Sequence, residues 1–141
     1  MTYAMEMHDS WLEEVVSNPD GTGFSTFYGS IFRSDGQVFK DAQESGWQKL
    51  RFDFEGMRIE GEIGELNTWA SGGELWIGGK NDNGIIFLPA EHTGRLCLEM
   101  CLAQDYRTLK IHATKIRSTF IGEFEIEAVW DAEGNPKRVD A

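Results

Sequence analysis

Three glutamates alternate with apolar residues in the segment FIGEFEIEAVW, which spans residues 120–130. On a strand, Glu123, Glu125 and Glu127 would lie about 7 Å apart in steps along one face. That spacing is near the separation of the two carboxyl groups of an inverting glycosidase. Such a pair must, however, face its substrate across a cleft, which neighbouring positions of one strand seldom do. The alternation favours the solvated face of a sheet, with a recognition surface for a basic partner as the alternative.

Basic residues of the preceding segment are expected to pair with this acidic row. Its polar positions hold Arg107, Lys110, Lys115 and Arg117. Since a few residues at 117–119 separate the two segments, we expect them to form a hairpin. Cross-strand Lys–Glu pairs would then contribute about 0.2–1 kcal/mol each.

Among the five tryptophans, two are candidates for binding. Trp47 stands beside Gly46 and Trp69 lies in NTWASGG, so we expect both in loops. A loop tryptophan either plugs the end of a sandwich, which is the favoured interpretation, or offers a flat apolar plate to a ligand or partner. Trp130 shares the parity of Phe124 and Ile126 and is expected in the core.

The other chemical patterns in the sequence are weaker. The HDS run at 8–10 could orient an imidazole, but sequence neighbours rarely face each other in a triad, and a helix cap by Asp9 or Ser10 is preferred. The GKNDNG run at 79–84 lacks the first ligand and the closing glutamate of a calcium loop. The three histidines show no zinc spacing. The sequence therefore predicts no catalytic residue, no cofactor and no metal site.

Charge narrows the classes of partner. Thirteen basic and 24 acidic residues give a formal net charge of -11. Nucleic acid and anionic membranes are disfavoured, because both are bound by clustered Lys and Arg. The charge leaves open a basic protein partner or a metal, and its simplest interpretation is a device for solubility.

The cysteines and the first residues favour a cytoplasmic location. Cys97 and Cys101 would lie about 13 Å apart on a strand, beyond the reach of a disulfide. The segment MTYAMEMHDSWLEE lacks the basic start and apolar core of a signal peptide. No apolar run approaches the roughly 20 residues of a membrane span.

Most of the chain shows the two-residue period of strands. The exception is HDSWLEEVVSN, where Ser10 and Glu13 have the form of a capping box and predict a short helix, with a first strand as the rival. The apolar parity switches across Gly56, which predicts a bulge or tight corner. Asn83-Gly84 predicts a hairpin turn between ELWIGG and IIFLP.

These elements predict an all-β, mainly antiparallel fold. About eight or nine short strands are expected in a sandwich, jelly roll or barrel, with at most one short N-terminal helix. We expect a single domain over 1–141, with residues 1–9 and 131–141 as frayed tails.

At the level of class, a small, acidic β domain without catalytic signatures is similar to bacterial toxin-immunity proteins. That likeness is compositional, and it implies a non-enzymatic domain that covers a basic protein. The residues assigned to binding are Trp47, Trp69, Glu123, Glu125 and Glu127. The alternatives are a carbohydrate or small-ligand module that uses the tryptophans, and an enzyme of unidentified reaction.

Overall fold

The computed structural model describes residues 1–139 as an antiparallel all-β fold, which confirms the predicted class. Ten strands lie within these residues, and the same range contains no helix, so none that could span a membrane. The strands are β1 (Thr2–Ser17), β2 (Gly23–Ser34), β3 (Gln43–Glu55), β4 (Arg58–Glu60), β5 (Thr68–Ile77), β6 (Ile85–Leu88), β7 (Glu91–Leu102), β8 (Thr108–Phe120), β9 (Glu125–Trp130) and β10 (Pro136–Arg138).

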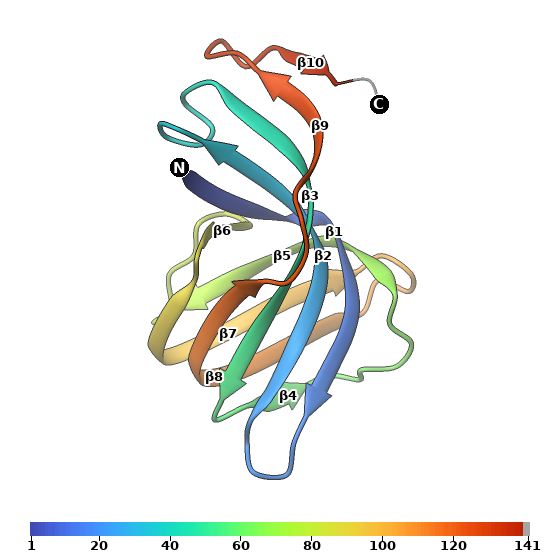
Figure 1. Cartoon of the computed structure of the whole chain (residues 1–141). Helices are drawn as coiled ribbons and strands as arrows, with labels where there is room; N and C mark the ends of the chain where they lie inside the picture. The colour runs from blue at the N-terminus through green and yellow to red at the C-terminus, as the bar shows by residue number, and fades with distance from the viewer. Residues whose placement is uncertain (140–141) are drawn as a thin grey trace.

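Six strands close into a barrel, in the order β1-β2-β3-β8-β7-β5 and back to β1. Closure depends on two pairings between strands that are distant in sequence, β3 with β8 and β1 with β5. Figure 1 shows β1, β2 and β3 side by side on one side of the barrel, with β5, β7 and β8 crossing behind them. The short β4 adds to β8 at the lower rim.

Three barrel strands continue beyond the barrel into an extension. The first residues of β1 pair with both β2 and β6, and the first residues of β3 pair with β9, which in turn pairs with β10. The later part of β3, Leu50–Glu55, pairs with β8 in the barrel instead. In Figure 1 the extension rises above the barrel and carries β9 and β10 at its top.

A bulge in β1 separates its barrel half from its extension half. The register against β2 shifts between Glu6 and Trp11, and Asp9 has a φ of 72°. Positive φ is tolerated by Asp better than by most non-glycine residues. The fully buried Ser10 donates its hydroxyl to the carbonyl of Glu6 at 2.7 Å. This bulge lets one strand take part in both the barrel and the extension.

The apolar faces predicted from the two-residue period form the barrel core. Leu96, Leu98, Met100 and Leu102 of β7 are buried, as are Leu109, Ile111 and Ala113 of β8. Gly56 has a φ of 60° and makes the corner between β3 and β4, as its parity switch predicted. A Cβ at that position would collide with Thr114 as well, so the corner requires glycine.

The prediction of an N-terminal helix is wrong, and the rival strand interpretation is correct. Residues 10–17 belong to β1, where a second register shift lies between Leu12 and Glu14. The expected frayed tail at 1–9 is also wrong, because Met5 and Met7 are fully buried. At the other end, Pro136–Arg138 of the expected tail 131–141 form β10, and residues 140–141 lie outside the described range.

Two predicted hairpins are replaced by longer-range pairings. Asn83 and Gly84 do have the positive φ values of the predicted turn, 54° and 84°, but β6 then pairs with β1. The pairings within residues 1–139 also join β9 to β3 and β10, not to β8. The expected ladder between the acidic row and the basic strand is therefore wrong. Lys110 instead reaches Glu60 and Glu99, at 3.8 and 3.5 Å.

Candidate binding face at the bend of β1

Four aromatic rings from four strands meet beside the bulge of β1. Tyr28 of β2 stacks on Trp47 of β3, with ring centroids 5.6 Å apart and planes at 13°. Trp47 meets Trp69 of β5 edge to face at 5.8 Å, and Trp69 meets Trp11 of β1 in the same way at 4.6 Å. Offset and edge-to-face ring pairs of this kind are favourable arrangements. The row therefore holds its rings in fixed orientations.

Two carboxylates of β9 fix the stacked pair at its polar ends. The indole Nε1–H of Trp47 donates to Glu127 Oε2 at 2.7 Å, and the Tyr28 hydroxyl donates to Glu125 Oε2. Burial, together with this hydrogen bond and the charge of Glu125, raises the pKa of Tyr28 from 10.0 to about 12. The pairing of β9 with β3 thus orients the aromatic row.

Gly46 allows β9 to approach β3 at this point. A Cβ on Gly46 would collide with the backbone of Glu125 and the ring of Phe124. The register between the two strands also shifts between Ser45 and Gly46. The glycine that suggested a loop for Trp47 is therefore a place of close strand contact.

Three adjoining depressions surround the bulge, and they share its side chains. The first, of about 210 Å³, is lined by Glu6 and His8 with residues of β5 and of the turn before β6. The second, of about 470 Å³, is lined among others by Glu6, Asp9, Trp47 and Glu127. The third, of about 410 Å³, lies between His8, Asp9, Trp47 and Trp69. We call the following residues together the bend face: Glu6, His8, Asp9, Trp47, Trp69 and Glu127.

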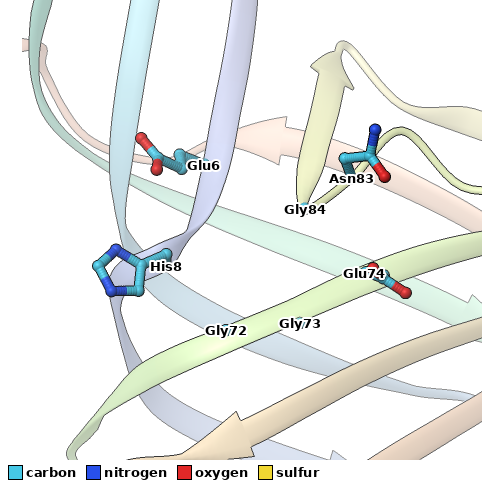
Figure 2. Close-up of a pocket in the computed structure, with 7 residues that line it drawn as sticks. All are labelled: Glu6, His8, Gly72, Gly73, Glu74, Asn83 and Gly84. Atoms are coloured by element: carbon cyan, nitrogen blue, oxygen red, sulfur yellow. The ribbon is translucent and has the colours of Figure 1, made fainter.

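The first depression is the more polar part of this region. Figure 2 shows Glu6 and His8 extending from β1 on one side, with Glu74 of β5 and Asn83 of the turn on the other. Gly72, Gly73 and Gly84 also line it and contribute no side chain. It can accept polar or cationic groups.

Acidic side chains dominate the electrostatics of the bend face. Partial burial raises the pKa of the Glu6 carboxyl above its ordinary value, while His8 lowers it and Asp9 raises it further. His8 Nδ1 lies 3.1 Å from Asp9 Oδ2, and both side chains are exposed. Because burial penalises the charged form of Glu6, a cation that neutralises it would be bound favourably.

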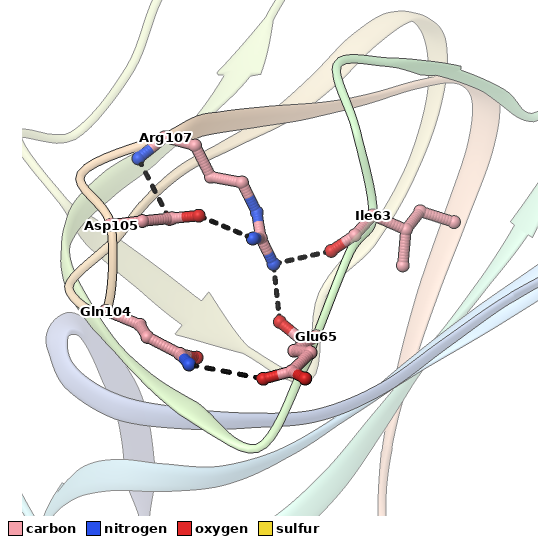
Figure 3. A network of polar contacts seen from close by, with 5 residues as sticks. All are labelled: Ile63, Glu65, Gln104, Asp105 and Arg107. Carbon is pink, nitrogen blue, oxygen red and sulfur yellow. Dashed lines mark hydrogen bonds and ion pairs between the residues drawn. The ribbon is translucent and has the colours of Figure 1, made fainter.

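A polar network holds the loops that flank Trp69. Arg107 donates to the carbonyl oxygens of Ile63, at 2.6 Å, and Glu65, and pairs with Asp105 at 2.8 Å. Figure 3 shows these contacts joining the segment before β5 to the one between β7 and β8. The backbone N–H of Ala103, from the second segment, donates to the Trp69 carbonyl at 2.8 Å. The network thus joins the two segments, one of which precedes Trp69 in the chain while the other bonds its backbone.

The structure brings some of the predicted binding residues together and leaves one apart. Trp47 and Trp69 lie on strands β3 and β5, so their expected place in loops is wrong. Trp69 remains 44% exposed. Glu125 and Glu127 contact the aromatic row, while Glu123 stands exposed between β8 and β9. All three glutamates are exposed, as predicted, but the inward-facing apolar row expected to alternate with them is not formed, because Ile126 is exposed as well.

Some members of the site have no signal in the sequence. Glu6 and Asp9 lie in a segment interpreted as a tail and a helix start, and Tyr28 was one aromatic residue among many. Trp130, expected in the core, is half-buried and lines the second depression, where its Nε1–H donates to Ser45 at 2.7 Å. Ile126, expected to face inward with it, is exposed.

The chemistry of the remaining polar clusters is limited. His112 Nε2 lies 3.0 Å from Glu60 Oε1, opposite Cys97 on β7. Burial and the nearby charge of Glu99 raise the pKa of the Cys97 thiol, which disfavours a reactive thiolate. Cys97 and Cys101 are both free, as predicted from their spacing. Within the described residues, no three metal-ligating side chains gather in one place.

No protein-family model matches the chain, and no curated protein or solved structure is significantly similar to it. Any function proposed for it therefore rests on its own residues.

Proposed function

We propose that the chain is a non-enzymatic binding module that engages a basic protein partner through the bend face. The observation that carries the proposal is the half-exposed Trp69, which lines a depression together with Trp47 and Asp9. Exposed aromatic rings are the residue type that most often anchors a protein interface. The Trp69 ring next to carboxylates can contact the apolar and the positively charged groups of a basic protein surface together.

Charge supports the same choice of partner. The net charge of -11 steers a basic protein toward the chain and raises the rate of encounter. The bend face contributes to this attraction with three carboxylates, those of Glu6, Asp9 and Glu127. An inhibitory or immunity-type role, in which the module covers a basic protein, fits this arrangement. Nucleic acid and anionic membranes fit it poorly.

The proposal places the module in the cytoplasm. Cys97 and Cys101 are free and lie too far apart on one strand to form a disulfide, so the fold does not depend on an oxidising compartment.

The test is capture of partners from a lysate of the native host, followed by titration with the purified protein that is captured. We expect a basic protein that binds at about 50 mM salt and is released at about 500 mM, because salt screens exposed charges. The variant Trp69→Ala should lose it. The variant Phe87→Ala removes a ring that is 52% exposed on β6, outside the bend face, and should retain it. Equal capture by both variants would contradict the proposal.

A carbohydrate module is the second candidate, and the exposure of Trp69 favours it too. A flat indole beside carboxylates can stack on a sugar ring while the carboxylates accept hydroxyl hydrogen bonds. Titration of tryptophan fluorescence against a panel of glycans separates the two functions. A shift that persists at high salt would favour the sugar, and an unchanged spectrum would exclude the glycans of that panel.

A further inference from the structure

We propose that the third depression of the bend face receives the guanidinium group of an arginine side chain. This inference rests on the proposed function, because the arginine belongs to the basic partner. The depression is lined by Trp47 and Trp69 together with Asp9 and His8.

The chain itself shows how its aromatic rings and carboxylates hold a guanidinium. Arg33 lies over the ring of Phe124, 4.0 Å from the centroid, and its Nε–H donates to Glu44 at 2.9 Å. The second case is Arg51, which lies 3.8 Å over the ring of Phe24 and donates to Asp53 at 2.8 Å. In each case one ring contacts the face of the guanidinium and one carboxylate contacts its edge.

The third depression offers the same two ingredients without an arginine of its own. Trp47 and Trp69 line it with their ring planes at 60° to each other, and Asp9 supplies the carboxylate. Among the described residues that line it, His8 is the one basic side chain, and it pairs with Asp9 at 3.1 Å. Trp is the ring with the strongest attraction for a cation.

The arrangement favours arginine over lysine. A guanidinium is planar, is weakly hydrated and can stack on an indole while its edge donates two hydrogen bonds. An ammonium is a compact, strongly hydrated charge that satisfies the carboxylate but gains less from the ring. Both cation–π contacts within residues 1–139 use arginine. The partner should therefore present arginine at this contact.

The experiment compares three peptides of equal length in a glycine–serine background, with arginine, lysine or citrulline at the same positions. Citrulline keeps the shape of arginine without its charge. The indole N–H resonances of the protein are followed by NMR, and the dissociation constant is taken from the titration. We expect the arginine peptide to shift the Trp47 and Trp69 resonances and to bind about fivefold or more tightly than the lysine peptide. The citrulline peptide should leave both resonances in place.

Two variants locate the contact. Trp69→Ala should weaken binding of the arginine peptide about tenfold and abolish the preference over lysine. Asp9→Asn removes the charge while keeping a residue that tolerates the φ of 72°, and it should weaken the same peptide about fivefold. Phe87→Ala is the control and should bind like the unaltered chain.

The outcomes separate this inference from the proposed function. If arginine and lysine peptides bind equally and Trp69→Ala has no effect on their ratio, the guanidinium site is wrong, while a basic partner remains supported. If a basic protein is captured but the arginine peptide shifts neither indole, the site is again wrong. If neither the peptide nor any basic protein binds at low salt, both are wrong.

Discussion

The hydroxyl oxygen of Ser10 accepts a hydrogen bond from the backbone N–H of Ser30 at 3.0 Å, across the gap that the bulge opens between β1 and β2. The same hydroxyl donates to the carbonyl of Glu6 at 2.7 Å. The buried Ser10 hydroxyl thus bridges the N–H of Ser30 and the carbonyl of Glu6, at the point where the register between β1 and β2 shifts. The bend face depends on this contact, because Glu6, His8 and Asp9 lie on the bulge.

The first prediction follows from that contact. Ser10→Ala should lower the free energy of unfolding by about 1–2 kcal/mol, since it removes a hydroxyl that bonds a partly buried N–H and a partly buried carbonyl. Urea unfolding followed by tryptophan fluorescence measures the change. Ser71→Ala, at an exposed serine of β5, is the matched control and should change the free energy by less than about 0.5 kcal/mol.

The second prediction concerns alkaline pH. Because the pKa of Tyr28 is raised to about 12, its contribution to stability is complete below its ordinary pKa of 10.0 and is lost as the pH rises through about 12. Tyr28→Phe should therefore lose less stability than the unaltered chain across that interval. Urea unfolding of both proteins on either side of the interval measures the difference. A spectrophotometric titration of tyrosinate provides a second check, since the variant should lack the component that titrates near 12.

The third prediction concerns Glu6. A carboxyl with a raised pKa stabilises the fold below its ordinary value of 4.5, and that contribution disappears as the pH rises through the folded-state pKa. Glu6→Gln should consequently be more stable than the unaltered chain at neutral pH, and the difference should vanish below about pH 4. Thermal unfolding at the two pH values tests this. A variant that is less stable at neutral pH would show that the Glu6 charge has a favourable role in the folded state.

The fourth prediction concerns the loops behind Trp69. Arg107→Lys retains the charge but cannot reach two carbonyls and a carboxylate together, so it should lower the free energy of unfolding by about 2 kcal/mol. Hydrogen exchange should become faster at residues 61–67 and at the N–H of Ala103. Arg117→Lys, at an exposed position of β8, is the control. Unchanged exchange in the first variant would mean that packing alone holds these loops.

Local periodicity was sufficient to predict most of the barrel. From Leu96 to Leu102 of β7 and from Leu109 to Ala113 of β8 every second residue is buried, because regular stretches of a closed barrel face the core and the solvent alternately. The same rule fails in β1. Leu12 and Val15 are both buried although they are three positions apart, since the register shift between Leu12 and Glu14 reverses the parity. A bulged strand therefore imitates the spacing of a helix.

The site was only partly predictable, because it is assembled by pairings distant in sequence. Trp47 and Trp69 were recognisable as unusual residues, but their meeting depends on how β2 and β1 pass between β3 and β5. The exposure of the three glutamates was correctly predicted. Its contact with Tyr28 and Trp47 could not be inferred, since adjacency in sequence suggested β8 as the neighbour of β9.

The three strands that run from the barrel into the extension have a consequence for cooperativity. A separate module attached by a linker could melt alone, but here the extension shares the unbroken backbones of β1, β2 and β3 with the barrel. Loss of either part removes the template on which the other is paired. Heat or denaturant should therefore unfold both parts in one transition. A partner that binds where the extension meets the barrel would slow amide hydrogen exchange in both parts.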